Sequence, residues 1–218
     1  MADLIISCLS QKGGVGKSTL ARLIATAYAA HEQRVCIYDF NGAQQTSVFW
    51  AEIRAKAGIE PLVAAELAQV SNRMATDRRY DVIVADGRPD SPDITLSTAL
   101  NSDLVIIPTS FTVDDLVPQR KFAFELITRG IEQHRIMFVL NRVIDHKQLT
   151  QEALEYLSDF RVAKTSLPYR ASYVRAHTTG YSIGEVGRMM LGNFDRMTQL
   201  TDDLTAEIAT YAMETSNV

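Results

Sequence analysis

The chain alternates short apolar runs with longer stretches in which apolar residues recur at helical spacing. Most of the short runs are continuously apolar, which is typical of strands covered on both faces. The predicted strands are Leu4–Leu9, Arg34–Phe40, Val82–Asp86, Leu104–Pro108, Ile136–Asn141 and Val162–Thr165. The predicted helices are Lys17–Ala30, Gln45–Ala57, Ala64–Arg79, Ser91–Asn101, Asp114–Gly130, Leu149–Ser158, Ile183–Met190 and Gly192–Met213.

This alternation predicts an α/β fold with a doubly wound, mostly parallel sheet, because helical crossovers of this length join parallel strands. Ligands of such sheets bind beyond the carboxyl ends of the strands. The chain shows no internal repeat and no Gly/Ser linker. We therefore expect a single domain over residues 1–218, with C-terminal helices of about 183–213 packed on it.

Composition narrows the class of protein further. The 218 residues are 46% hydrophobic and 22% charged, with a formal net charge of −4. The two cysteines, Cys8 and Cys36, fall in predicted strands, so a disulfide scaffold is excluded. No apolar run approaches the length of a membrane span, and we expect a cytoplasmic protein. The charge argues against a wholly basic nucleic-acid coat but leaves a local basic face open.

A glycine-rich segment links the first predicted strand to the first predicted helix. Its glycines let several backbone N–H groups converge on one point, and the helix N-terminus adds its positive dipole end. Lys17 brings a cation to the terminal phosphates, and the Ser18 hydroxyl is a ligand for Mg²⁺. A turn that only caps the helix is the alternative, which the Gly-Lys-Ser-Thr ending disfavours. The predicted phosphate-binding residues are Lys12, Gly13, Gly14, Val15, Gly16, Lys17, Ser18 and Thr19.

Carboxylates end the second and third predicted strands. Asp39 and Asp86 are therefore predicted to join Ser18 in holding Mg²⁺. Arg88, two residues after Asp86, is expected to face solvent, with a contact to phosphate or to a partner as the alternative. Asp114 and Asp115 begin a predicted helix and favour its dipole.

The segment Lys12–Ser18 resembles the deviant Walker A loop of the ParA and MinD ATPases, although Gln11 replaces a glycine of the plain motif. In that family the first lysine reaches across a nucleotide-sandwich dimer, so the resemblance implies that Lys12 does so and that ATP drives homodimerisation. It also implies catalytic roles for Lys12, Lys17, Asp39 and Asn41. Asp114 and Asp115 fall where the family's sequence leads into a dimer-facing helix.

The segment after the second strand departs from the family pattern Asp-x-Asp-Pro-Gln. Asn41 occupies the place of the second aspartate, which in the family is tied to hydrolysis. An amide positions water but accepts no proton at neutral pH. We expect slow hydrolysis that depends on an activator, or an ATP-gated scaffold with little turnover. Asn41 as a simple turn residue is a further alternative.

The resemblance covers about residues 1–190. Asn141 and Arg142 look like the family's adenine-contacting pair, and Pro168 and Tyr169 like its loop over the base. A kinase or amidoligase with a small-molecule acceptor is a third alternative, but no acceptor motif is visible.

The closest branch by resemblance is the small, ParF-like partition ATPases, which implies non-specific DNA binding, nucleoid association and a ParB-like adaptor or activator. The phosphate loop starts ten residues into the chain, so no N-terminal operator-binding domain is expected. The acidic Asp202–Glu207 stretch disfavours a MinD-like membrane tail. Arg73, Arg78 and Arg79 are assigned to a helix end. The DNA-binding candidates, each alternatively a solubilising residue, are Arg120, Lys121, Arg170, Arg175, Arg188 and Arg196.

Overall fold

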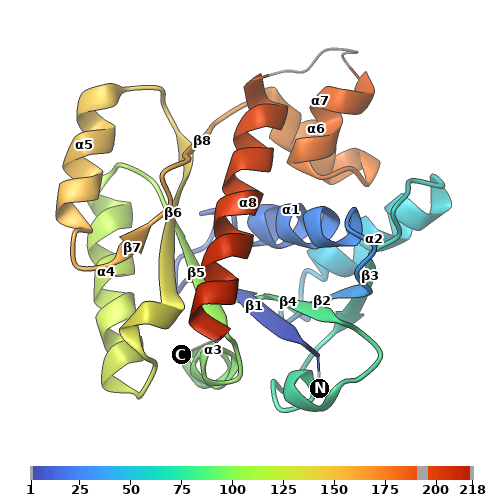
Figure 1. Cartoon of the computed structure of the whole chain (residues 1–218), viewed down its shortest axis with the longest axis horizontal. Helices are drawn as coiled ribbons and strands as arrows, with labels where there is room; N and C mark the ends of the chain where they lie inside the picture. Colours follow the sequence, from blue (N-terminus) through green and yellow to red (C-terminus); the bar gives the residue numbers. More distant parts are fainter. Residues whose placement is uncertain (1, 191–195, 217–218) are drawn as a thin grey trace.

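The computed structural model describes residues 2–190 and 196–216, and a single sheet with helices on both faces runs through it (Figure 1). The strand order is β3-β2-β4-β1-β5-β6-β7, with β8 also paired to β6, and every pairing recorded among the described residues is parallel. The strands are β1 (Leu4–Cys8), β2 (Val35–Asp39), β3 (Ala64–Leu67), β4 (Val82–Asp86), β5 (Leu104–Thr109), β6 (Ile136–Val143), β7 (Arg161–Val162) and β8 (Leu167–Pro168). The predicted doubly wound α/β class is confirmed.

Eight helices are assigned within the described residues, together with two short 3-10 turns. They are α1 (Lys17–Ala29), α2 (Thr46–Lys56), α3 (Pro92–Leu100), α4 (Val113–Thr128), α5 (Lys147–Tyr156), α6 (Ala171–Thr179), α7 (Ile183–Met190) and α8 (Arg196–Ser216). No helix in the described ranges is both long and apolar enough to cross a membrane.

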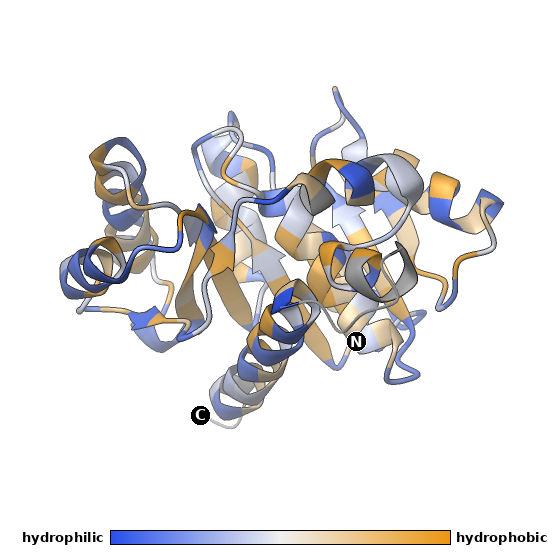
Figure 2. Cartoon of the chain, turned by 90° about the horizontal axis from the view of Figure 1, so that it is seen from above, coloured by the Kyte–Doolittle hydropathy of each residue, from blue (hydrophilic) through white to orange (hydrophobic). Residues whose placement is uncertain are grey.

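Alternate residues of each strand face opposite layers of helices. Along β4, Val82 and Val84 join the core beneath α1, α7 and α8, while Ile83 and Ala85 face a second cluster around Met74. The core under α4 and α5 is built on β5 and β6. Figure 2 shows the result, with apolar colour along the strands and polar stripes on the outer turns of the helices. Both cysteines are buried free thiols.

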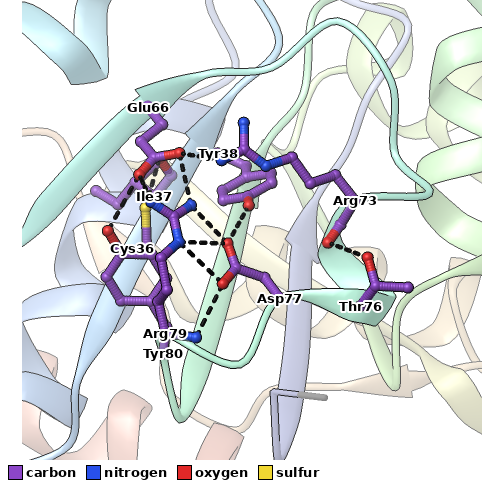
Figure 3. A network of polar contacts seen from close by, with 9 residues as sticks. All are labelled: Cys36, Ile37, Tyr38, Glu66, Arg73, Thr76, Asp77, Arg79 and Tyr80. Carbon is purple, nitrogen blue, oxygen red and sulfur yellow. Dashed lines mark hydrogen bonds and ion pairs between the residues drawn. The ribbon is translucent and has the colours of Figure 1, made fainter.

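The predicted helix Ala64–Arg79 is wrong. Its first residues form the edge strand β3, paired to β2, and Met74–Thr76 forms only a 3-10 turn. Figure 3 shows the polar network that holds the segment: Arg79 donates to Glu66 at 2.7 and 2.9 Å and to Asp77 at 2.6 Å, and Tyr38 Oη donates to Asp77 at 2.7 Å. Tertiary pairing thus overrides the helical propensity of the alanine-rich stretch. Arg73 and Arg79 serve this network rather than a helix end.

Three further differences concern the last third of the chain. The predicted strand Val162–Thr165 is replaced by two shorter ones, β7 and β8, both paired to β6. Helix α6 was not predicted. The predicted helix Gly192–Met213 is observed as α8, and residues 192–195 lie outside the described residues.

Candidate functional site

The phosphate loop follows the central strand β1 and ends at the first turn of α1. Gly14 and Gly16 have φ values of 77° and 101°, in the left-handed region. A Cβ on Gly16 would lie 2.0 Å from Nδ2 of Asn141. That amide donates to the carbonyl of Val15 at 2.9 Å, and Arg142 donates to the carbonyl of Gly14. The end of β6 therefore supports the loop directly.

Two lysines of the loop point to different places. Lys17 is buried, and its Nζ donates to the carbonyl of Lys12 at 2.8 Å. Burial lowers the pKa of Lys17, and Asp86 acts in the opposite direction. The side chain of Lys12 lies outside the cavity, where it pairs with Asp115 and donates to the carbonyl of Asp114 at 3.1 Å. The first turn of α4 thus holds Lys12 within its own chain.

Asp115 is itself held by the segment before α4. Ser110 and Thr112 both donate to its Oδ2, Thr112 at 2.7 Å. Burial alone would raise the pKa of Asp115, but the hydrogen bonds from Lys12, Ser110 and Thr112 outweigh burial and lower it. Asp115 is therefore an ionised partner of Lys12 in addition to its place in the first turn of α4.

The two predicted metal carboxylates lie side by side, because Asp39 and Asp86 are register partners in β2 and β4. Asp86 accepts from Ser18 Oγ at 3.1 Å and from Ser47 Oγ at 2.7 Å. Asp39 accepts from the backbone N–H groups of Asn41 at 2.9 Å and Ser47 at 2.8 Å. Burial, with the neighbouring charge of Asp39, raises the pKa of Asp86 to about 6.

The donor set fits a magnesium ion that arrives with phosphate. A hydroxyl and a carboxylate are the oxygen ligands that Mg²⁺ uses together with substrate phosphates and water. Within the described ranges, no group of three or more His, Cys, Asp or Glu is placed to hold a metal by itself. Ser18 and Asp86 are therefore suited to complete a shell that the nucleotide supplies in part.

A cavity of about 460 Å³ lies over the loop, a size typical of ligand sites. Asn41, predicted to be catalytic, borders it, and so do most of the predicted nucleotide-binding residues: Gly13, Gly14, Gly16, Lys17, Ser18, Thr19 and Arg142. Asn41 also exchanges hydrogen bonds with Gln44, at 3.0 and 3.3 Å. Asn141 lies behind the loop, and Val15 is buried there. Pro168 and Tyr169 do not border the cavity, although the Tyr169 ring lies 5.0 Å from the Arg142 guanidinium carbon.

Three residues of the site were missed by the sequence reasoning: Arg22 and His177 border the cavity, and Ser47 links Asp39 to Asp86. Arg88, expected to face solvent, borders the cavity, which agrees better with the alternative of a phosphate contact. A signal existed for Arg22, since it is the only charged residue in the apolar run Leu20–Ala25. His177 lies on α6, which the sequence pattern did not reveal.

The predicted DNA-binding residues are spread over the molecule. Arg120 pairs with Asp159 and stacks over Phe124 and Tyr156. Arg196 pairs with Asp145 at 3.1 Å. Lys121, Arg170 and Arg175 are exposed, and the side chain of Arg188 lies outside the described residues. Arg120 and Lys121 are on α4, on the opposite face of the sheet from α6, so DNA binding stays a prediction.

Comparisons with known proteins agree on the type of site. The model of the CobQ/CobB/MinD/ParA nucleotide binding domain matches residues 6–183. The "Maintenance of carboxysome distribution protein A" of Gloeobacter kilaueensis is 30% identical over 179 residues, which cover 79% of this chain and 77% of the relative. Among solved structures, the Mg-ADP complex of MinD from Pyrococcus horikoshii matches with a TM-score of 0.74 at 16% identity, covering 99% of both chains. A plasmid partition protein of Borrelia burgdorferi bound to AMPPNP matches with a TM-score of 0.64 at 20% identity, covering 97% of both.

Proposed function

Because the chain belongs to the CobQ/CobB/MinD/ParA family of nucleotide-binding proteins, we propose that it is an ATP-dependent switch ATPase that closes into a homodimer. The observation that carries the proposal is that the two lysines of the loop lie in different places relative to the cavity. Lys17 stays within the cavity wall, whereas Lys12 lies outside it with its side chain 39% exposed. A cation so placed serves a second nucleotide better than its own.

ATP and Mg²⁺ fit the cavity as follows. The N–H groups of the loop and the N-terminus of α1 bind phosphate oxygens, and Lys17 neutralises the terminal phosphates. Ser18 and Asp86 hold Mg²⁺, which when bound supplies charge neutralisation at the phosphates. Asp39 orders the start of α2 and the turn at Asn41 through its two backbone hydrogen bonds. The Asn41 amide then positions water at the open side of the cavity without accepting its proton.

The dimer is proposed to bind DNA without sequence preference, as an element of nucleoid association in the cytoplasm. A ParB-like adaptor or activator would stimulate hydrolysis and release. The cargo is a plasmid, a chromosomal locus or a protein body; the last is favoured by the name of the carboxysome-distribution relative.

Replacing Lys12 tests the dimer. With Mg²⁺ and ATP, sedimentation velocity should show the wild-type chain at twice the mass of its nucleotide-free form. Lys12→Ala should stay monomeric while binding ATP with unchanged affinity, because its side chain does not border its own cavity. Lys56→Ala, at an exposed lysine of α2, is the matched control and should dimerise normally. A Lys12→Ala dimer as tight as wild type contradicts the proposal.

DNA binding is tested on the same samples. The ATP form should bind plasmid DNA at low salt, with affinity that falls steeply as salt rises and does not depend on sequence. A wild-type ATP dimer that ignores DNA at 50 mM salt would leave the switch intact and remove the nucleoid from the proposal.

The second candidate function is an ATP-gated scaffold with little or no hydrolysis, and Asn41 is the observation that favours it. Asn41→Asp restores the carboxylate of the family pattern at the cavity wall. We expect phosphate release to rise about a hundredfold or more, the contribution typical of a single general base. The Gln44→Glu variant places a carboxylate on the neighbouring cavity residue and serves as control. Equal rates for wild type and Asn41→Asp would count against a hydrolytic role for position 41.

A further inference from the structure

Arg22 is a buried guanidinium on the wall of the nucleotide cavity. It lies in the second turn of α1 and is 4% exposed. Its Nε donates to Ser47 Oγ at 3.2 Å, and Nη1 contacts Nδ1 of His177. Across residues 2–190 and 196–216, no carboxylate forms an ion pair with it. The nearby carboxylates of Asp39 and Asp86 offset the cost of burying this cation only in part, and a ligand phosphate would offset more of it.

The pKa of Arg22 and its unused hydrogen-bond donors also favour a negatively charged ligand. Burial lowers its pKa to about 10, while Asp86 and Asp39 act in the opposite direction from a greater distance. A guanidinium carries five N–H donors in a fixed fork. Two of them are used within the protein, and the side chain borders the cavity. The remaining donors match the oxygens of a phosphate group.

His177 fixes the orientation of this guanidinium. Burial, and then the charges of Arg22 and Arg142, lower the pKa of His177 to about 4, so the ring is neutral at pH 7. Because a guanidinium only donates, Nδ1 accepts from Arg22, and Nε2–H donates to Thr19 Oγ1 at 3.0 Å. His177 thereby joins α6 to two successive turns of α1.

The position of Arg22 along α1 decides which phosphate it meets. The loop lysine serves the terminal phosphates and the Ser18 hydroxyl serves Mg²⁺. Thr19 and Arg22 come one and four residues after Ser18 along α1, beyond the residues assigned to the terminal phosphates and Mg²⁺. We infer that Arg22 binds the phosphate nearest the sugar, the α-phosphate of ATP or ADP, and that His177 is its positioning residue.

This inference rests on the proposed ATP binding and adds a subsite to it. The contact between Arg22 and the α-phosphate does not involve the γ-phosphate, so ADP retains this contact after hydrolysis. The contact also depends on the position of α6, because His177 lies on this helix. Helix α6 begins directly after Tyr169 and Arg170.

Thio-substituted nucleotides test the assignment by isothermal titration calorimetry in Mg²⁺. Sulfur is a poorer hydrogen-bond acceptor than oxygen, so ATP with sulfur on the α-phosphate should bind wild type more weakly than ATP. Arg22→Gln should weaken ATP and ADP by the same factor, about tenfold to a hundredfold. It should also abolish the penalty for α-sulfur while leaving that for γ-sulfur unchanged. Arg78→Gln, at an exposed arginine, should bind every nucleotide as wild type does.

Variants of His177 separate positioning from general support of the fold. His177→Ala should reduce the α-sulfur penalty although Arg22 is intact, and His177→Gln, which keeps a donor and an acceptor, should restore it in part. His31→Gln is the exposed control. Should Arg22→Gln fail to fold, Arg22→Lys keeps the charge without the fork and should lose most of the α-sulfur penalty.

Two results would overturn the inference. One is an unchanged α-sulfur penalty in Arg22→Gln; the other is a loss confined to ATP, which would place Arg22 at the terminal phosphate. Lys17→Ala separates this failure from that of the proposed function. If Lys17→Ala weakens ATP binding and Arg22→Gln does not, only the subsite is wrong, whereas a wild-type chain that binds no ATP defeats both.

Discussion

Asp86 combines a structural cost with a chemical role. It is 2% exposed, lies beside Asp39, and has Ser18 and Ser47 as hydrogen-bond donors. Its pKa is raised from 3.8 to about 6, so ionising it in the nucleotide-free protein opposes folding. A cation bound there would remove this cost. If Asp86 holds Mg²⁺ as proposed, the protein is less stable when the ion is absent.

The pH dependence of stability follows from this shift. Between pH 4 and 6 the folded chain keeps a proton on Asp86 that the unfolded chain loses, so this group's stabilisation is lost as pH rises through 6. At pH 7.5 Asp86→Asn should be more stable than wild type by about 3 kcal/mol, and at pH 4.5 by only about 1 kcal/mol. Urea denaturation without nucleotide measures both.

The difference between the two proteins isolates Asp86 from other acids. Hydrogen bonds from arginines lower the pKa values of Asp77 and Asp81, whose contributions are lost only as pH falls well below 4. With Mg²⁺ and ATP present, the order should reverse, since the amide is a poor ligand for the cation. A variant less stable than wild type by the same amount at both pH values would contradict the argument.

At the scale of elements, α2, α6 and α7 are joined through one buried side chain. Arg54 is fully buried and donates to Glu185 of α7 at 2.7 and 2.8 Å. It also donates to the carbonyl of Gly180, at the end of α6, at 3.0 Å. Gly180 has a φ of 81°, and a Cβ there would lie 2.7 Å from the backbone of Arg54. The close approach of α6 to α2 therefore requires glycine.

Gly180→Ala should lower stability by about 3 kcal/mol or more, because backbone strain adds to the collision with α2. Gly130→Ala is the matched control: its φ is 98°, but nothing lies within 4 Å of the new Cβ. It should cost only about 1–2 kcal/mol, the conformational part alone. Urea midpoints of the two variants compare these costs directly. Equal losses would show that α6 moves away from α2 freely.

The elements that were predicted correctly are those whose conformation is determined by residues nearby in the sequence. The continuously apolar strand β4 and the helix after the phosphate loop were placed within one residue of their bounds. The segment from Ala64 to Arg79 was not, because its conformation depends on pairing with β2 and on the contacts of Glu66 and Asp77. Helix α6 was not predicted, and His177 was missed with it. The phosphate loop could be predicted because its residues are contiguous in the sequence. Arg22 and Ser47 could not, because only the fold brings them to the site.

For the molecule as a whole, the ion pair between Lys12 and Asp115 competes with the proposed dimer. A lysine that is to reach a second subunit must first leave its partner on α4. Gln11 and Ser10 bond to the same helix, through Glu125 at 3.0 Å and Gln119 at 2.6 Å. Residues 10–12 of the loop are thus tied to α4, and Lys12 can leave only if these residues move with the helix or lose their contacts with it.

Asp115→Asn should favour the dimer, because it removes the charge that holds Lys12 within its own chain. A half-exposed ion pair is worth up to about 1 kcal/mol and one is broken in each subunit, so the dimer dissociation constant in ATP should fall by up to about thirtyfold. Asp114→Asn is the control, since only its backbone carbonyl contacts Lys12. Concentration-dependent sedimentation measures the change. A weaker dimer would instead give Asp115 a role in the interface.

The position of Trp50 gives this chain an optical reporter of its own. It is the sole tryptophan of the sequence. Two guanidinium groups lie over its ring, with the Cζ atoms of Arg22 and Arg54 at 5.6 and 5.5 Å from the centroid. The indole N–H donates to the carbonyl of Tyr181 at 3.0 Å. Any shift of Arg22 toward a phosphate, or of α7 relative to α2, alters the quenching of that one fluorophore, so its emission follows both events without a label.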